Sequence, residues 1–197
     1  MRSPTLGIVL IALSGCSRPA PPPPAPTPAL TSSAKGAEDG ADVIGTRPPE
    51  WEATHWLNTA PLTLASLRGK VVLVRWWTAG CPYCSATAPA LRDFAHDYAD
   101  RGLVVVGMYH HKDDAPLDLT VVDRTAAKYG FTFPVAVDPD WHTLDRWWEP
   151  KAKSRRFTSV SFLLDRQGVI QHVHPGGEYA KGQPSYDAMR AAIDRLL

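Results

Sequence analysis

The sequence predicts one α/β domain, built on a mixed, mainly parallel central sheet with helices on both faces. From about Trp51 onward, short apolar runs rich in β-branched residues alternate with segments of helical periodicity. The last two apolar runs flank a turn signal of the kind that joins antiparallel strands. A chain of 197 residues is long enough for one such domain with a sizeable core, and it is short for two.

The first half of this domain is predicted to run strand, helix, strand, helix. Residues 70–77 and 103–109 are continuous apolar runs, which are typical of buried strands. Between them, residues 85–102 repeat apolar side chains at helical spacing and end on a glycine. Residues 119–130 form a second helical pattern that also ends on a glycine. We expect Arg75, which interrupts the first strand, to lie at a sheet edge or to extend its charged end outward.

The second half is predicted to contain an extended segment, a short helix, two antiparallel strands and a closing helix, over residues 133–138, 140–148, 159–165, 168–174 and 185–197. Trp141 and Trp148 follow one face of the short helix, which favours a place in the core over a ligand site. In sheets of this kind, reactive groups gather at the carboxyl ends of the parallel strands. The candidate site is therefore expected just after residue 77.

The charge of the chain gives no indication of a polyanionic partner. There are 21 basic and 20 acidic residues, with a formal net charge of +1. No broad positive field is available to attract nucleic acid or an anionic membrane surface.

The first 16 residues are predicted to be an export signal. Arg2 precedes a short apolar run, residues 6–13, which is too short to span a bilayer and is followed by small residues and Cys16. The stretch LSGC resembles the lipobox of bacterial lipoproteins, which implies that Cys16 becomes a lipidated N-terminus. Ser17, the next residue, favours outer-membrane sorting by the same resemblance. The alternative is an ordinary signal peptide with an incidental cysteine.

Residues 17–48 are predicted to be a disordered linker between this anchor and a folded domain over residues 49–197. The segment is rich in Pro, Ala, Ser and Gly and has almost no large apolar side chains, so it cannot bury enough surface to fold. Its proline-dense first half is expected to act as a semi-rigid spacer. With Cys16 assigned to the anchor, Cys81 and Cys84 are the cysteines left in the folded part.

The motif CPYC, residues 81–84, is the strongest chemical signal in the sequence. Cys81 follows a predicted strand, and Pro82 suits the first position of a helix, where a missing N–H costs nothing. A helix N-terminus stabilises a thiolate, so Cys81 is the expected nucleophile. Cys84 lies one turn further on, on the same side and within disulfide reach. The pair can therefore attack a disulfide and then resolve the product.

Two other roles of the pair remain open at this stage. A structural disulfide that closes so short a loop removes little chain entropy and would stabilise the fold weakly. A zinc site needs four ligands, and no second CxxC is present, although histidines at residues 110–111 and at 172 and 174 could contribute.

Residues 62–91, LTLASLRGKVVLVRWWTAGCPYCSATAPAL, resemble the extracytoplasmic thiol-disulfide oxidoreductases of the TlpA/ResA type, within the redoxin group. The shared features are the LRGKVVL lead-in, a strand that ends in aromatic residues, the CxxC, and Pro89 five residues after the second cysteine. The resemblance extends loosely from Trp51 to Leu197. It implies a thioredoxin fold in which Cys81 attacks and Cys84 resolves.

The chain departs from the family pattern at two positions near the site. Gly80 stands where a tryptophan usually precedes the first cysteine, which implies a more open rim. Ser159 stands where the family usually has a cis-proline, and a cis bond before serine would be costly. Substrate contacts are expected from Pro82 and Tyr83 between the cysteines, and from Thr158 and Ser159 opposite them.

Two alternative functions share this kind of fold. Thr78, three residues before Cys81, is compatible with a peroxiredoxin-like thiol peroxidase, although the proline of that pattern is Val74 here. Alternatively, two thiolates and a histidine, His172 or His174, could bind copper(I) for delivery.

The predicted activity is thiol-disulfide exchange, in the direction of disulfide reduction, on the periplasmic side of a bacterial membrane. Cys81 would form a mixed disulfide with an extracytoplasmic protein, and Cys84 would displace the reduced partner. A second redox protein must then reset the pair. No organic cofactor is required, no nucleic acid is involved, and a lipid-anchored monomer is expected.

Overall fold

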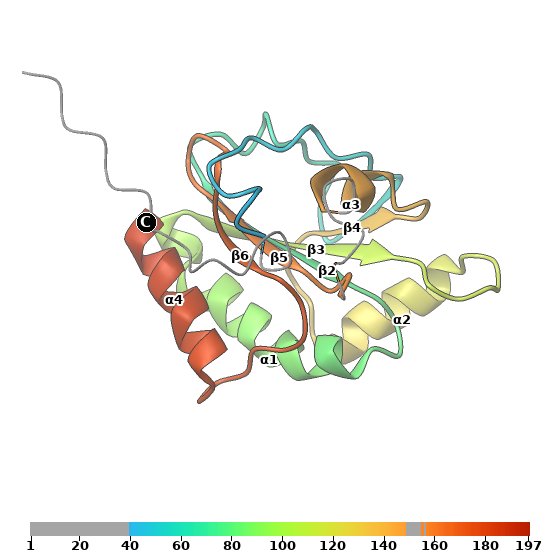
Figure 1. The fold of residues 1–197 in the computed structure, drawn as a ribbon. Helices are drawn as coiled ribbons and strands as arrows, with labels where there is room; N and C mark the ends of the chain where they lie inside the picture. The colour runs from blue at the N-terminus through green and yellow to red at the C-terminus, as the bar shows by residue number, and fades with distance from the viewer. Residues whose placement is uncertain (1–39, 149–154, 156) are drawn as a thin grey trace, which may run out of the picture. The chain divides into compact units, whose positions relative to one another are not determined.

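A six-stranded mixed sheet forms the centre of the structure, a computed structural model that describes residues 40–148, 155 and 157–197 (Figure 1). The strand order is β1-β4-β3-β2-β5-β6. Three central strands run parallel: β2 (Val71–Trp77), β3 (Leu103–His110) and β4 (Val135–Asp138). The other three are antiparallel to their neighbours: β1 (His55–Leu57), β5 (Ser161–Leu164) and β6 (Ile170–His174).

Helices cover both faces of this sheet. One face carries α1 (Pro82–Asp97), α2 (Leu119–Tyr129) and α4 (Pro184–Leu196), which are drawn below the sheet in Figure 1. The short helix α3 (His142–Trp147) lies on the opposite face, together with the segment before β2. The predicted fold class is confirmed: this is a thioredoxin-like arrangement with a mixed central sheet between helices.

The predicted elements occur close to their expected positions. Asp118 caps the start of α2 by accepting a hydrogen bond from the backbone N–H of Thr120, and Gly130 ends the helix with a left-handed φ of 70°. Helix α1 ends earlier than its pattern indicated: a short 3₁₀ turn, Ala99–Arg101, precedes Gly102. No sequence pattern predicted β1, because three residues are too few to show strand alternation.

The folded part begins before residue 49, where the linker was predicted to end. The backbone of Gly45 donates to the carbonyl of Ile170 at 2.8 Å, and Ile170 donates to Thr46 at 2.9 Å, so this segment pairs with the start of β6. Val43 packs into the core with 3% of its surface exposed. Residues 40–48 therefore belong to the folded unit, while the predicted signal sequence, Cys16 and the rest of the linker lie outside the described residues.

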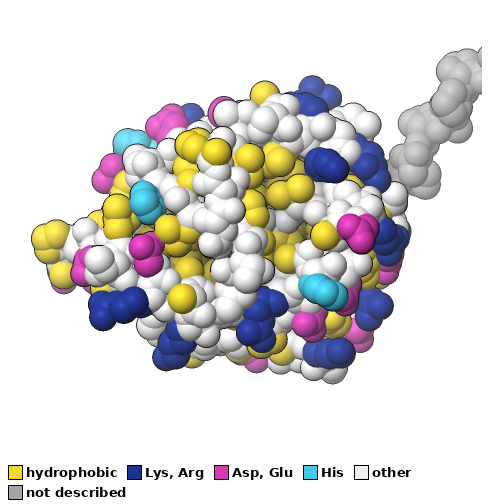
Figure 2. Space-filling model, turned by 180° about the vertical axis from the view of Figure 1, so that it is seen from behind, with side chains coloured by type: hydrophobic (Ala, Val, Ile, Leu, Met, Phe, Trp, Pro, Cys, Tyr) yellow, Lys and Arg dark blue, Asp and Glu magenta, His cyan; other side chains and the backbone are white. Residues whose placement is uncertain are grey.

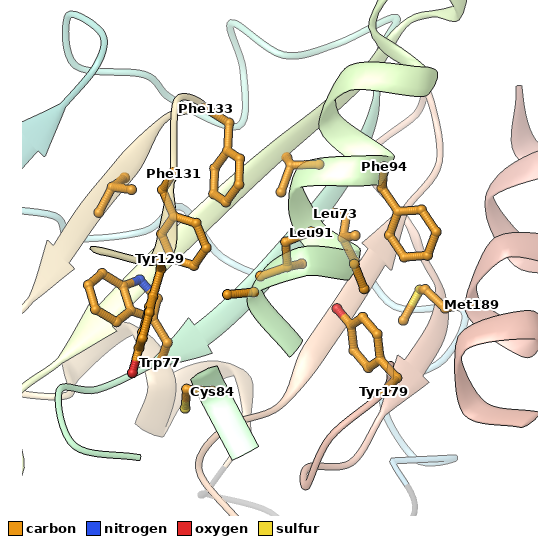
Figure 3. Close-up of a cluster of buried hydrophobic side chains, with 14 of the residues drawn as sticks. Leu73, Trp77, Cys84, Leu91, Phe94, Tyr129, Phe131, Phe133, Tyr179 and Met189 are labelled. Carbon is orange, nitrogen blue, oxygen red and sulfur yellow. The ribbon is translucent and has the colours of Figure 1, made fainter. Parts of the chain in front are cut away.

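Alternate residues of β2 point into two different apolar layers. Leu73 and Trp77 enter the layer under α1, α2 and α4, which Figure 3 shows. Val74 and Trp76 enter the layer on the α3 side, where Trp76 contacts Trp147 edge-on with ring centres 5.3 Å apart. This alternation follows from the two-residue period of a strand that is buried on both faces.

Arg75 is not where it was expected. It lies in β2, between β3 and β5, and none of its surface is exposed. The expectation of an edge position or an outward-pointing charge was wrong, because β2 is a central strand covered on both faces.

Trp148 is buried, as predicted, whereas Trp141 is only half-buried and adopts a left-handed φ of 63° just before α3. Trp141 donates from Nε1 to the carbonyl of His111 at 2.6 Å and packs edge-on against His110. Trp141 thus packs against the α3-side core and also supports the end of β3.

Charged side chains of both signs are spread over the face that Figure 2 shows, without one large patch of a single sign. This distribution agrees with the near-zero net charge of the chain. Within the described part of the chain, none of the helices combines the length and the apolar character needed to cross a membrane.

Candidate active site

Cys81 lies at the junction between strand β2 and helix α1. The turn of residues 78–80 connects the two elements, and Pro82 is the first residue of the helix, as predicted. The Sγ atom of Cys81 caps the helix by accepting a hydrogen bond from the backbone N–H of Cys84 at 3.2 Å. This donor and the positive end of the helix dipole favour negative charge on the sulfur, which suits a nucleophile.

The two cysteines differ in accessibility. Cys81 is half-exposed, whereas Cys84 has 2% of its surface exposed and lies in the apolar layer near Trp77 and Tyr129 (Figure 3). Burial raises the pKa of the Cys84 thiol to about 12, although the positive charge of Arg75 acts in the opposite direction. A substrate can therefore reach Cys81 but not Cys84, which separates an attacking thiol from a resolving one.

A cavity of about 380 Å³ opens beside Cys81. Its walls come from three places in the sequence: the turn and helix start at residues 78–83, the end of β3 with His110, Lys112 and Asp113, and the segment of residues 157–159. The last two walls meet where His110 Nε2 and Thr158 Oγ1 are hydrogen-bonded at 2.9 Å. Two of the three walls thus follow the carboxyl ends of parallel strands, β2 and β3, as the fold class predicts.

The structure brings together all four residues that were predicted to contact substrate. Pro82, Tyr83, Thr158 and Ser159 line the cavity together with Cys81. Tyr83 is 44% exposed and packs edge-on against Phe157, with ring centres 5.9 Å apart. The described backbone contains no cis peptide bond, so Ser159 follows a trans bond. Their contact with a substrate remains a prediction.

The rim at Gly80 is open. This glycine has a φ of 74°, in the left-handed region that side chains disfavour, and a Cβ placed there would meet no atom within 4 Å. A second cavity, of about 260 Å³, lies on the other side and is lined by Lys128 and Tyr129 among others. Gly80, Cys81 and Pro82 border both cavities, so Cys81 can be approached from two sides.

His110 and Phe157 line the cavity although the sequence analysis did not assign them to this site. His110 is fully buried, and burial, assisted by the charge of Lys112, lowers its pKa to about 3, so the imidazole is neutral at physiological pH. The position of His110 at the end of a parallel strand was the available signal. No local pattern pointed to Phe157, since its neighbour Tyr83 is far away in the sequence.

The histidines considered as metal ligands do not join the cysteines in a ligand cluster. Within residues 40–148, 155 and 157–197, no group of three or more His, Cys, Asp or Glu side chains is arranged to hold a metal ion. His172 and His174 lie on β6, where burial lowers the pKa of both, that of His174 to about 4. The ring of His174 packs edge-on against Tyr179.

Comparison with known proteins assigns the family. Residues 44–173, more than half of the chain, match the model of the AhpC/TSA family. The chain belongs to this family. The match confirms the resemblance to redoxins.

Among curated relatives, the chain is 30% identical over 158 residues to Protein DipZ of Mycobacterium bovis, a match that covers 77% of this chain and 22% of DipZ. It is 25% identical over 116 residues to the thiol-disulfide oxidoreductase ResA of Halalkalibacterium halodurans, covering 59% of this chain and 60% of ResA. The chain thus matches only about a fifth of the DipZ length. These relatives support the expectation of a thiol-disulfide oxidoreductase.

Among solved structures, a thiol:disulfide interchange protein of the thioredoxin family from Chlorobium tepidum superposes with a TM-score of 0.62 at 20% identity. The superposition covers 79% of this chain and 99% of that one. At this identity the likeness establishes the fold.

Proposed function

We propose that this protein is an extracytoplasmic thiol-disulfide oxidoreductase that reduces disulfides of other proteins through Cys81 and Cys84. The observation that carries the proposal is the asymmetry of the pair. Cys81 opens to two cavities at the N-terminus of α1, and Cys84 is buried one helical turn behind it. One thiol is placed to meet a substrate and the other to displace it.

The proposed reaction has two steps. In the first, the Cys81 thiolate attacks one sulfur of the substrate disulfide; the substrate S–S bond breaks, and the leaving sulfur departs as a thiolate that takes up a proton. In the second, Cys84 loses its proton and attacks Sγ of Cys81, which releases the other substrate sulfur and forms the Cys81–Cys84 disulfide. Two electrons move from the dithiol to the substrate, so the exchange itself needs no organic cofactor.

The partners are proteins with accessible disulfides, together with a second redox protein that restores the dithiol. The open rim at Gly80 supports a macromolecular substrate, because no side chain there obstructs the approach to Cys81. The export-type sequence of residues 1–16, with its LSGC stretch, supports a lipid-anchored location outside the cytoplasm, with Cys16 as the anchor. An oxidising compartment of that kind is one in which disulfide substrates persist.

A thiol peroxidase is the second candidate. Thr78 and Cys81 line the same cavity, and the family match is to AhpC/TSA. In that reaction the Cys81 thiolate attacks a peroxide oxygen, giving a sulfenic acid and water or an alcohol, and Cys84 condenses with the sulfenic acid. The close resolving thiol suits protein disulfides better, so we place disulfide exchange first.

The two functions are separated by offering both oxidants to the reduced chain. We suggest the full-length chain with Cys16→Ser, so that Cys81 and Cys84 are its only thiols. Stoichiometric oxidation of the pair by insulin, with insulin thiols appearing in equal number, supports the oxidoreductase. Rapid oxidation by hydrogen peroxide with no reaction toward insulin would instead favour the peroxidase.

A further inference from the structure

Arg75 is a buried cation that has no carboxylate partner among the described residues. Its side chain is inaccessible to solvent, and its hydrogen bonds run to neutral groups: Nη1 donates to Ser161 Oγ at 3.3 Å, and Nη2 donates to the carbonyl of Gly177 at 2.6 Å. Nε has no partner. Among the residues that the structure describes, Arg75 forms no salt bridge. Burying a charge in this way is costly unless a counter-charge is available.

The side chain of Arg75 lies on the same face of β2 as the resolving cysteine. Leu73 and Trp77, two residues before and after it, enter the layer under α1, and strand alternation directs Arg75 to that layer too. The guanidinium lies 5.4 Å from the ring centre of Tyr179. Figure 3 shows Tyr179, Leu73, Trp77 and Cys84 in this one layer.

The titratable side chains around Arg75 are neutral unless one of the two thiols ionises. The titratable side chains that interact electrostatically with Arg75 or with Cys84 come from β3, β6, α1, α2 and the segment before α4: Cys81, Cys84, Tyr129, His110, His174 and Tyr179. Burial raises the pKa of both tyrosines and lowers that of both histidines, so all four favour their neutral forms. Of the two thiols, only that of Cys84 lies within the buried layer.

We propose that Arg75 is a positioning residue for the resolving step, whose fixed positive charge stabilises the thiolate of Cys84 while it attacks Sγ of Cys81. The proposal rests on the two-step exchange proposed above. In this step Cys84 gives up its S–H proton and the Cys81–Cys84 bond forms. The bond between Cys81 and the substrate sulfur breaks, and that sulfur leaves as a thiolate that takes up a proton. Arg75 exchanges neither proton nor electron. Its charge is held in place beforehand by the Ser161 and Gly177 contacts, so no reorganisation is needed.

The arrangement predicts a selective effect on the second step. Cys81 is half-exposed and has its own stabilisation from the helix N-terminus, and solvent screens it from a charge in the core. Cys84 has no such solvent access. Because burial raises its pKa to about 12, resolution at neutral pH depends on a small thiolate population that the charge of Arg75 increases.

The test follows both steps in one experiment with the full-length chain carrying Cys16→Ser. Less than one equivalent of the chromogenic disulfide dithiobis(nitrobenzoate) is mixed with the reduced chain in a stopped-flow instrument. Attack by Cys81 releases one coloured thiolate, and resolution by Cys84 releases the second. In the Cys84→Ser variant the second phase should be absent, which identifies it as resolution by Cys84.

Three substitutions at Arg75 and one elsewhere are compared. Arg75→Met and Arg75→Gln remove the charge, Gln keeping some hydrogen-bonding capacity, and Arg75→Lys retains a cation. Arg124→Met, on the exposed surface of α2, is the matched control. We expect the first phase to be unchanged in all folded variants. We expect the second phase to slow roughly three- to thirty-fold in the Met and Gln variants. Loss of the opposite charge raises the pKa of Cys84 by about one to three units, which reduces its thiolate population. A thiolate of higher pKa is more nucleophilic, and this offsets about half of the effect on the logarithm of the rate.

We expect the pH profile of the second phase to move to higher pH in the same two variants, and Arg75→Lys to restore part of the rate. The proposal would be overturned if the second phase of the folded Met or Gln variants had the wild-type rate. Equal slowing of both phases, or a Lys variant no faster than Met, would also overturn it. If the wild-type chain itself shows no second phase, the proposed function fails instead.

Discussion

The two faces of strand β2 differ in what they contribute to the protein. Val72, Val74 and Trp76 point into a layer of aromatic and aliphatic side chains on the α3 side. On the other side, a cation and a thiol, Arg75 and Cys84, lie among mainly apolar side chains. The α3 face therefore contributes mainly to stability, whereas the other face carries reactive groups whose burial costs stability. This comparison implies that the two properties can be changed separately.

The largest expected effect comes from the cysteines themselves. Cys81→Ser removes the exposed nucleophile and should abolish insulin reduction, while the free energy of unfolding changes by less than about 1 kcal/mol because the side chain is half-exposed. Cys84→Ser should retain the first step and accumulate a mixed disulfide with insulin, detectable as a mass adduct. Activity in Cys81→Ser would show that the assigned nucleophile is wrong.

A matched pair of tryptophans tests the separation of the two faces directly. Trp76→Ala and Trp77→Ala each remove a buried indole, and each should lower the free energy of unfolding by about 3–5 kcal/mol in a urea titration. Only Trp77→Ala alters the layer that surrounds Cys84. In variants that still fold, we expect the second thiolate-release phase to change for Trp77→Ala and to stay at the wild-type rate for Trp76→Ala. A changed second phase in Trp76→Ala with a wild-type rate in Trp77→Ala would contradict the separation of the two faces.

A smaller effect is expected in the pH dependence of stability, through the buried His110 at the wall of the cavity. His110 has a native pKa of about 3, below its ordinary value of 6.5, so the unfolded chain binds a proton that the native chain excludes. Stability from the neutral ring is complete above pH 6.5 and declines as the pH falls toward 3, by about 1.4 kcal/mol per pH unit.

His110→Phe keeps an aromatic ring against Trp141 but cannot titrate. Between pH 7 and pH 5 the wild type should lose about 2 kcal/mol of unfolding free energy that the variant keeps. The difference between the two proteins, measured in urea titrations, should change by that amount. His174 is partly buried and its pKa is also lowered, but it is present in both proteins, so its effect cancels in the difference. A wild-type-to-variant difference that is the same at both pH values would mean that His110 does not titrate as described.

The smallest effect is expected at the exposed wall of the cavity. Tyr83→Ala removes the edge-on contact with Phe157, which should cost about 0.5–1.5 kcal/mol of stability. If Tyr83 also contacts substrate, KM for insulin should rise while the rate with small disulfides stays the same. Tyr83→Phe keeps the ring and serves as the control. An unchanged KM would exclude Tyr83 from substrate binding.

The local features of the site could be predicted from the sequence because neighbouring residues determine them. Pro82 at the first position of α1, Cys81 as its cap and Cys84 one turn later all follow from the order of residues 77–84. The alternation of apolar runs and helical patterns likewise predicted the layers, because burial on both faces of a parallel sheet leaves a clear pattern.

What could not be predicted depends on contacts between distant segments. Arg75 meets Ser161, Gly177 and Tyr179, which follow it by 86 or more residues, so its burial left no local trace. The same holds for residues 40–48, whose composition resembles a linker but which pair with β6. For these, tertiary contacts outweigh local composition.

A redox titration shows whether Cys81 and Cys84 form one redox couple. The full-length chain with Cys16→Ser is equilibrated in glutathione and dithiothreitol buffers, and free thiols are trapped and counted by mass. We predict a single reversible transition in which both thiols disappear together, with two electrons per chain. Independent oxidation of Cys81 while Cys84 stays a thiol, or no reversible transition, would contradict the account.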